Sequence, residues 1–391
     1  MTLVYRIFIF VWFLPFVFYL IPRPETHEYV KGYVAITPLF PGVLIYTLVG
    51  VMALVFGLFF SIPFYKKTQI AAPEKSLTED DLNFAFKKSL IVFFLAMIGV
   101  LSSWQKIILF DGLESVLLSF ALGTGNDFRE ILYEGYKSLP YGFRHLTGPS
   151  AAVLFFTALE LKKSRLYFLL IVVVLLLNIL ITSRLTLILF AVVFAACYIV
   201  SKKKPSKILI LSGIGFMFIV LMVTNYIRNV NYFESYGIYN PVSMLIIQIR
   251  QYIETAFVGA LSFCSDPFIF PKGPYIQMSM NGGGEFLSAK AAYHTGIKEE
   301  FTQISGLLFL FTKVDILALL IFPIVLGAAL AGYNYFVQFG FVRIMEVGIL
   351  LYGVSDSWRT FIFFQGFFII NILTSILIHR FVPSKSVQVV K

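Results

Sequence analysis

Charged residues are scarce in this sequence, and that scarcity excludes an ordinary soluble protein. Only 13% of the 391 residues are Asp, Glu, Lys or Arg, whereas 59% are hydrophobic. Soluble domains carry about a quarter charged residues. Long apolar runs without charge indicate membrane-spanning helices. The sequence therefore predicts an all-α polytopic integral membrane protein, with a single membrane domain over residues 1–391.

The sequence also lacks the signatures of disulfide, metal and nucleotide chemistry. Its two cysteines, Cys197 and Cys264, fall in segments predicted on opposite sides of the bilayer, and no Cys/His spacing is typical of a metal site. There is no Walker A motif and no GxSxG motif. We therefore expect no metal and no cofactor. The net charge of +10 is explained by basic cytoplasmic loops, so we expect no nucleic-acid partner.

About ten apolar segments are candidates to cross a hydrocarbon core of about 30 Å. The run from Leu166 to Ser201 is too long for one crossing, so it predicts a helical hairpin whose turn is Thr182-Ser183-Arg184. The first span is expected to remain as an uncleaved helix. The predicted spans are 3–21, 42–64, 88–109, 145–161, 166–182, 185–201, 208–226, 314–333, 343–355 and 360–379.

The distribution of Lys and Arg predicts the orientation. Basic residues gather in short segments, such as 202–207 and the loop that ends with Lys87 and Lys88, which indicates the cytoplasmic side. Both termini are then cytoplasmic, and the hairpin turn faces outward. Two long outer loops remain, a smaller one at 110–144 and a large one at 227–313. The large loop contains a predicted membrane-associated helix over 241–263, with Asn240 as its N-cap and a proline at its first position.

The polar pair Ser183-Arg184 interrupts the apolar run "NILITSRLTLIL". An arginine is costly near membrane depth and is disfavoured on the outer side. It also begins a helix, where the dipole repels a cation but attracts an anion. The pair therefore predicts an anion site, and a guanidinium suits phosphate. The alternative is an arginine that reaches the lipid headgroups.

Four more arginines are predicted on the outer side and are candidates for the same anion site: Arg144, Arg228, Arg250 and Arg359. Each has an alternative in headgroup contact or a local ion pair. Asp356 is three residues before Arg359, and Glu254 is four residues after Arg250, so both spacings suit ion pairs on a helix.

Histidines on the outer side are candidates for acid–base chemistry, because the imidazole titrates near neutral pH. They are His27, His145 and His294. His294 lies in the large loop near several glutamates. The alternative for a lone loop histidine is a solvent-exposed residue without a role.

The hairpin "ILITSRLTLIL", the external loop with "YIRNVNYF" and the smaller outer loop together resemble one family. It comprises the repeat-unit polymerases of bacterial O-antigens and capsules, which are related to the O-antigen ligases. The resemblance covers the whole chain as architecture, and it is specific around Ser183-Arg184 and, less so, around Arg228 and Arg250.

The resemblance implies the all-helical architecture of lipid-linked glycosyltransferases and a place in the bacterial plasma (inner) membrane. The implied substrate is an oligosaccharide on undecaprenyl pyrophosphate, and the implied partners include membrane lipids, a flippase and a chain-length regulator. The arginines and Ser183 would bind the pyrophosphate. The base would be His294, His145 or Glu254.

Three other functions remain open. A glycan ligase performs the same transfer onto a lipid A core. A flippase or secondary transporter would place charge deep in many spans, whereas these spans are nearly bare apart from Glu346. A non-catalytic membrane subunit would leave the outer arginines unexplained.

Overall fold

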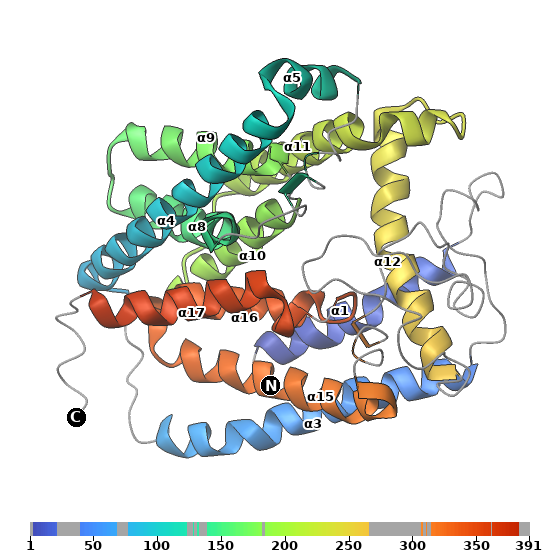
Figure 1. Cartoon of the computed structure of the whole chain (residues 1–391). Helices are drawn as coiled ribbons and strands as arrows, with labels where there is room; N and C mark the ends of the chain where they lie inside the picture. The colour runs from blue at the N-terminus through green and yellow to red at the C-terminus, as the bar shows by residue number, and fades with distance from the viewer. Residues whose placement is uncertain are drawn as a thin grey trace. The chain divides into compact units, whose positions relative to one another are not determined.

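The computed structural model is almost entirely helical over the residues that it describes (Figure 1). No strand occurs among these residues. The described residues are 3–21, 40–68, 77–122, 128, 131–132, 139–181, 184–265, 306–307, 310, 314–360 and 362–382.

Four of the described helices are long and apolar enough to cross a membrane. These segments are Pro41–Phe64, Glu79–Asp111, Lys207–Thr224 and Ala318–Val337. Shorter apolar helices cover Leu3–Val17, Arg165–Ile181, Leu185–Ser201 and Gly366–Phe381. The chain is thus an all-α protein whose helices suit a membrane.

The chain divides into two compact units. Unit 1 comprises Met1–Lys66, Tyr236–Asn334 and Gly353–Gln365, and unit 2 comprises Lys67–Ser235, Tyr335–Tyr352 and Gly366–Lys391.

Unit 1 is built on α1 (Leu3–Leu20), α3 (Phe40–Thr68), α12 (Pro241–Ser265) and α15 (Ala318–Val337). Trp12 of α1 stacks on Tyr46 of α3, with ring centroids 4.4 Å apart. Each side chain donates a hydrogen bond to the other's carbonyl. Farther along, the Asn334 amide donates to Tyr5 and Ser61 at 3.3 and 3.2 Å. These buried bonds join three apolar helices. The other elements of this unit are η3 (Asp315–Leu317) and η5 (Ile362–Phe364).

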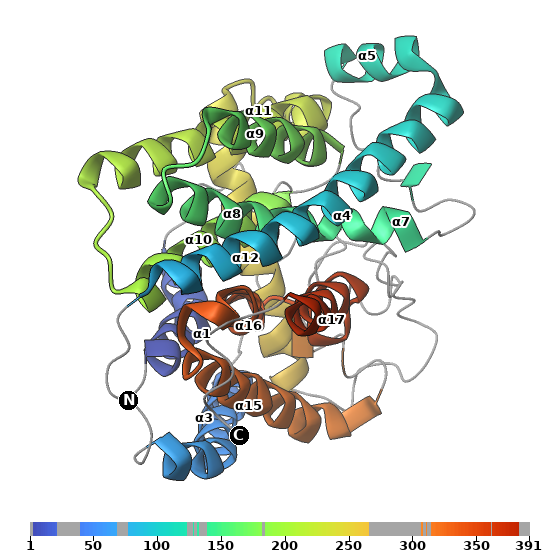
Figure 2. The same ribbon diagram turned by 90° about the vertical axis from the view of Figure 1, so that its left-hand side faces the viewer.

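Unit 2 is organised around α8 (Thr147–Glu160), which packs against both α4 (Glu79–Asp111) and α10 (Arg184–Ser201) (Figure 1 and Figure 2). Nearly every residue of α8 from Thr147 to Ala158 is buried. The other elements of this unit are α5 (Leu113–Leu122), α7 (Leu139–Gly142), η2 (Phe143–Leu146), α9 (Arg165–Ile181), α11 (Lys207–Glu234), η4 (Gly340–Arg343), most of α16 (Ile344–Asp356) and α17 (Gly366–Phe381).

Two local predictions are confirmed. The run from 166 to 201 is a helical hairpin, because α9 ends at Ile181 and α10 begins at Arg184. Asn240 caps α12, since its side-chain oxygen accepts from the Val242 backbone N–H at 2.9 Å. Pro241 then occupies the first helical position, where its missing N–H costs nothing.

Several expected boundaries differ from the structure. The expected spans at 145–161 and 343–355 correspond to α8 and α16, which have 14 and 13 residues. Each helix alone is shorter than the about 20 residues of a full crossing, although η2 runs directly into α8 and η4 into α16. The expected loop at 110–144 contains α5 and α7, and α11 continues past residue 226 to Glu234. Short helices packed within the protein satisfy their own backbone groups, so these segments need not be irregular.

Candidate functional site

The short turn η2, which carries Arg144 and His145, is held by the four helices α4, α8, α9 and α17 of unit 2. Gly99 of α4 sets the closest approach. A Cβ atom at that position would lie 2.2 Å from the Arg144 backbone nitrogen. Only glycine lets the two backbones approach so closely. Arg144 is itself 3% exposed, so its charge is enclosed by the protein.

The Arg144 carbonyl accepts two hydrogen bonds that fix the turn. Thr147 Oγ1 donates to it at 2.6 Å, and Asn178 Nδ2 donates from α9 at 3.0 Å. Buried polar groups are costly unless they are hydrogen-bonded. These two bonds therefore hold the backbone of Arg144 in one place relative to α8 and α9.

Asn178 also connects this turn to the start of α10. Its amide donates to Thr186 Oγ1 at 2.9 Å, and both side chains are almost fully buried. Gly148 lets α8 approach the same point, because a Cβ atom there would lie 2.7 Å from the Thr186 carbonyl oxygen. Arg184 begins α10 two residues earlier. The structure therefore brings together Arg144, His145 and the helix start that carries Arg184.

A buried arginine beside a helix N-terminus forms a site of positive potential. The first N–H groups of α10 lack partners within the helix, and the helix dipole adds positive charge there. Such a site favours anions, above all phosphate groups. The arrangement can therefore stabilise a negative charge that develops during a reaction.

His145 lies on the same turn, next to α17. Its carbonyl accepts from Asn371 Nδ2 at 3.1 Å, and its ring centroid is 5.8 Å from that of Phe367. The imidazole is partly buried. It is therefore the candidate base that lies closest in sequence and structure to the Arg144 turn.

Arg250 and Glu254 lie in unit 1 and bind each other. Arg250 Nε donates to Glu254 Oε1 at 2.5 Å, which confirms the predicted ion pair. Arg250 Nη2 also donates to the carbonyl of Ile21, just past α1, at 2.6 Å. Glu254 is fully buried. These contacts anchor α12 on the end of α1, and they leave the Glu254 carboxylate in a poor position to accept a proton from a sugar.

Arg359, also in unit 1, forms the predicted ion pair with Asp356. Two parallel hydrogen bonds of 2.8 Å join the guanidinium to the carboxylate. Arg228 lies on α11, but its side chain lies outside the described residues, as does that of Arg184. Ser183 and His294 lie outside the described residues altogether.

A second buried cluster of charge was not predicted from the sequence. Lys88, expected in a cytoplasmic loop, lies inside α4, and its Nζ contacts Glu346 Oε1 at 2.7 Å. Arg343 Nη1 contacts the same oxygen at 3.0 Å. The expectation for Lys88 was wrong because a buried glutamate needs a cation beside it. The signal was the acidic Glu346 in an otherwise apolar span.

Asn178 and Thr186 are the site residues that the sequence reasoning missed. Both stand inside the hairpin run, on either side of its turn, and a polar amide in an apolar span usually has a partner. Among the described residues, no group of three or more His, Cys, Asp or Glu side chains is placed to hold a metal ion. No protein-family model, curated protein or solved structure matches this chain.

Proposed function

We propose that the protein is a glycosyltransferase of bacterial membranes that polymerises oligosaccharide repeats carried on undecaprenyl pyrophosphate. The observation that carries the proposal is the junction of the buried Arg144 turn with the start of α10, where Arg184 lies. This junction suits a pyrophosphate, and the resemblance of the Ser-Arg hairpin to the polymerase family supplies the identity of the lipid-linked substrate.

In the proposed reaction, a hydroxyl oxygen of the incoming repeat attacks the anomeric carbon of the growing glycan. The new C–O bond forms as the bond from that carbon to the pyrophosphate oxygen breaks. The leaving undecaprenyl pyrophosphate keeps the electron pair and gains negative charge. Arg144, Arg184 and the N–H groups at the start of α10 would stabilise this charge. No nucleotide is needed, because the glycosyl pyrophosphate bond supplies the energy.

The hydroxyl proton must pass to a base. His145 is favoured among the described candidates, because it lies on the Arg144 turn. Glu254 is less suited, since it is buried and bound to Arg250. His294 stays a candidate from the sequence.

In this proposal the chain crosses the bacterial plasma membrane about ten times, with both termini in the cytoplasm. The hairpin turn then lies on the outer face, where lipid-linked repeats are joined after a flippase delivers them. A chain-length regulator is a further proposed partner.

The proposal is tested by an Arg184→Ala variant expressed in a strain that lacks the gene. We expect loss of long surface polysaccharide while single repeats are still attached, because the anion site is lost. Arg184→Lys should also fail, since an ammonium cannot form the two parallel bonds of a guanidinium. The measurement is gel electrophoresis of the surface polysaccharide, alongside immunoblots for protein level.

Arg165→Ala is the matched control. Arg165 begins α9 as Arg184 begins α10, it is exposed, and it lies at the opposite end of the same hairpin. We expect it to leave chain length unchanged. Normal polymer in Arg184→Ala cells would remove Arg184 from the site, and normal polymer in the strain that lacks the gene would refute the proposal. Loss of even single attached repeats would favour the ligase.

The buried Lys88–Glu346 pair favours a second candidate, a flippase or transporter, because charge inside a membrane bundle often marks a transport path. The two functions differ in where lipid-linked repeats accumulate when the protein is missing. A polymerase mutant should collect them on the outer leaflet, where added glycosidases can reach them. A flippase mutant should collect them on the inner leaflet.

A further inference from the structure

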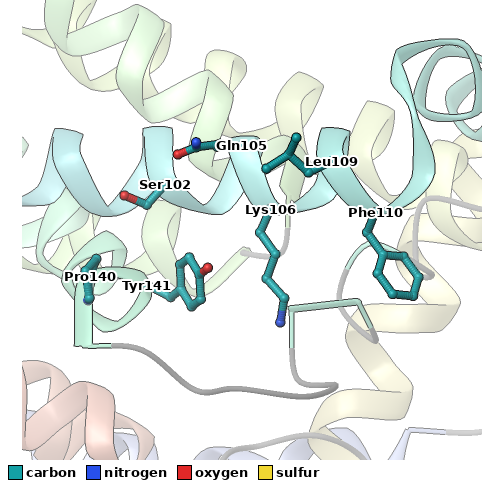
Figure 3. A pocket seen from close by; sticks show the side chains of 7 residues that line it. All are labelled: Ser102, Gln105, Lys106, Leu109, Phe110, Pro140 and Tyr141. Atoms are coloured by element: carbon teal, nitrogen blue, oxygen red, sulfur yellow. The ribbon is translucent and has the colours of Figure 1, made fainter.

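A pocket of about 420 Å³ opens between α4 and α7 in unit 2. Its volume lies in the range of about 300–1,000 Å³ that small-molecule sites occupy. Figure 3 shows the lining residues. They are Ser102, Gln105, Lys106, Leu109, Phe110, Pro140 and Tyr141.

An aromatic ring and a cation meet in this pocket. Lys106 Nζ lies 5.5 Å from the centroid of the Tyr141 ring, and the two side chains lie side by side in Figure 3. The same ammonium donates to the Leu132 carbonyl at 3.4 Å. These two contacts hold the Lys106 side chain next to the ring and orient both toward the pocket.

The hydrogen-bonding groups of the lining are mostly neutral. A serine hydroxyl, a glutamine amide and a tyrosine hydroxyl can each donate and accept, whereas Lys106 is the one cation among the described lining residues. A phosphate site usually has more positive charge than one lysine. Leu109, Phe110 and Pro140 add apolar surface to the lining. The combination of an aromatic face with several neutral polar groups suits a polyhydroxylated ring, which presents C–H faces and hydroxyl edges.

The pocket lies directly beside the Arg144 turn. Tyr141 and Pro140 belong to α7, which continues without a break into η2. A Cβ atom on Gly99 of α4 would lie 2.9 Å from the Pro140 carbonyl oxygen as well as 2.2 Å from the Arg144 nitrogen. The same helical contact thus positions both the pocket and the buried arginine.

We infer that this pocket binds a saccharide, namely the sugar residue next to the pyrophosphate of the lipid-linked substrate. That the bound saccharide is this particular sugar rests on the proposed function, whereas saccharide binding itself rests on the lining of the pocket. The Tyr141 ring stacks on the sugar ring, and Gln105, Ser102 and Lys106 bind its hydroxyls. A sugar held here places its pyrophosphate toward the Arg144 turn.

The test uses the full-length protein in lipid nanodiscs and saturation-transfer difference NMR. The probes are methyl glycosides of common hexoses and N-acetylhexosamines, which are small, neutral and free of phosphate. We expect saturation transfer from the wild-type protein to at least one glycoside. Tyr141→Ala and Gln105→Leu should each weaken binding of that glycoside about tenfold, as for the loss of one well-formed contact.

Leu101→Ala is the matched control. Leu101 lies on the same part of α4 but is 53% exposed and outside the pocket lining, so its variant should bind like the wild type. Gln105 is itself exposed, so its variant tests the pocket even where Tyr141→Ala does not fold. The inference is overturned if the folded wild type transfers saturation to no glycoside, or if Gln105→Leu and folded Tyr141→Ala bind as well as Leu101→Ala.

The Arg184→Ala variant separates this inference from the proposed function. It should retain glycoside binding, because the pocket lies on α4 and α7 rather than on α10. Glycoside binding by the wild type, together with normal polymer in cells that lack the gene, would support the pocket and refute the polymerase. Loss of polymer in Arg184→Ala cells, with no glycoside binding by the wild type, would support the polymerase and overturn the pocket.

Discussion

At the scale of single residues, the arginines differ in what holds them in place. Arg250 binds Glu254 on its own helix. Arg359 lies just beyond the end of α16 and binds Asp356, the last residue of that helix. Such pairs anchor local structure. Arg144 differs, because its backbone is held by bonds from two other helical segments beside a helix N-terminus. An acid on or next to the same helix thus explains Arg250 and Arg359 as structural arginines, whereas its place beside a helix N-terminus makes Arg144 a candidate for anion binding.

Lys88→Met is expected to destabilise the protein severely. The change leaves the Glu346 carboxylate buried with only Arg343 beside it, and breaking a buried pair costs about 3–5 kcal/mol. The measurement is the free energy of unfolding of purified protein in mixed micelles titrated with denaturing detergent.

Two further variants serve as controls for the Lys88→Met result. Lys87→Met removes the neighbouring lysine, which is exposed, and should change stability little. The double variant Lys88→Met/Glu346→Met should recover most of the loss, because no buried carboxylate remains. A single variant as stable as the wild type would contradict the structural role of the pair.

At the scale of elements, close approach between backbones determines where the candidate site forms. We expect Gly99→Ala to disrupt the contact of α4 with η2, because the added Cβ would meet the Arg144 nitrogen at 2.2 Å. Overpacking of this kind costs about 1–3 kcal/mol. The variant should lose stability and polymer together, measured by thermal unfolding and polysaccharide gels.

Gly213→Ala is the control for this change. Gly213 also lies within a helix, α11, but a Cβ atom there meets nothing within 4 Å. Its variant should be neutral or slightly more stable, since alanine favours helices over glycine. Equal behaviour of the two alanine variants would show that the α4–η2 contact does not matter.

The elements also show what the sequence could predict. Length alone indicated the α9–α10 hairpin, and Asn240-Pro241 indicated the start of α12, because both signals are local. The α7–η2 turn could not be predicted, since its conformation depends on Gly99, Asn178 and other residues far along the chain. Pairing of Lys88 with Glu346, 258 residues apart, likewise depends on tertiary packing. Positive charge at the hairpin was predictable, whereas its connection to Arg144 through Asn178 was not.

At the scale of the whole molecule, the orientation in the membrane can be tested directly. Cys197 and Cys264 are both buried free thiols, so replacing them with alanine gives a background without cysteine. In intact cells, we expect a membrane-impermeant maleimide to label Thr182→Cys in the hairpin turn. It should label Lys204→Cys, in the exposed turn between α10 and α11, only after the cells are permeabilised.

The reverse labelling would place the hairpin turn in the cytoplasm and exclude a reaction there with lipid-linked repeats of the outer leaflet. Labelling of both positions in intact cells would show that the membrane is leaky, and a cytoplasmic reporter protein serves as the internal check.

The enclosure of α8 has a consequence for how this sequence can change over evolutionary time. Only about 6% of the apolar segment Lys207–Thr224 of α11 is buried, so almost any apolar residue suits these positions. Nearly every position of α8 from Thr147 to Ala158 is instead packed inside unit 2, and its hydroxyls bond to backbone carbonyls one turn earlier, as Ser150 and Thr157 do. Substitutions there are limited by volume rather than by hydropathy. Distant relatives should therefore retain the α7–α8 segment long after their lipid-facing helices have diverged beyond comparison.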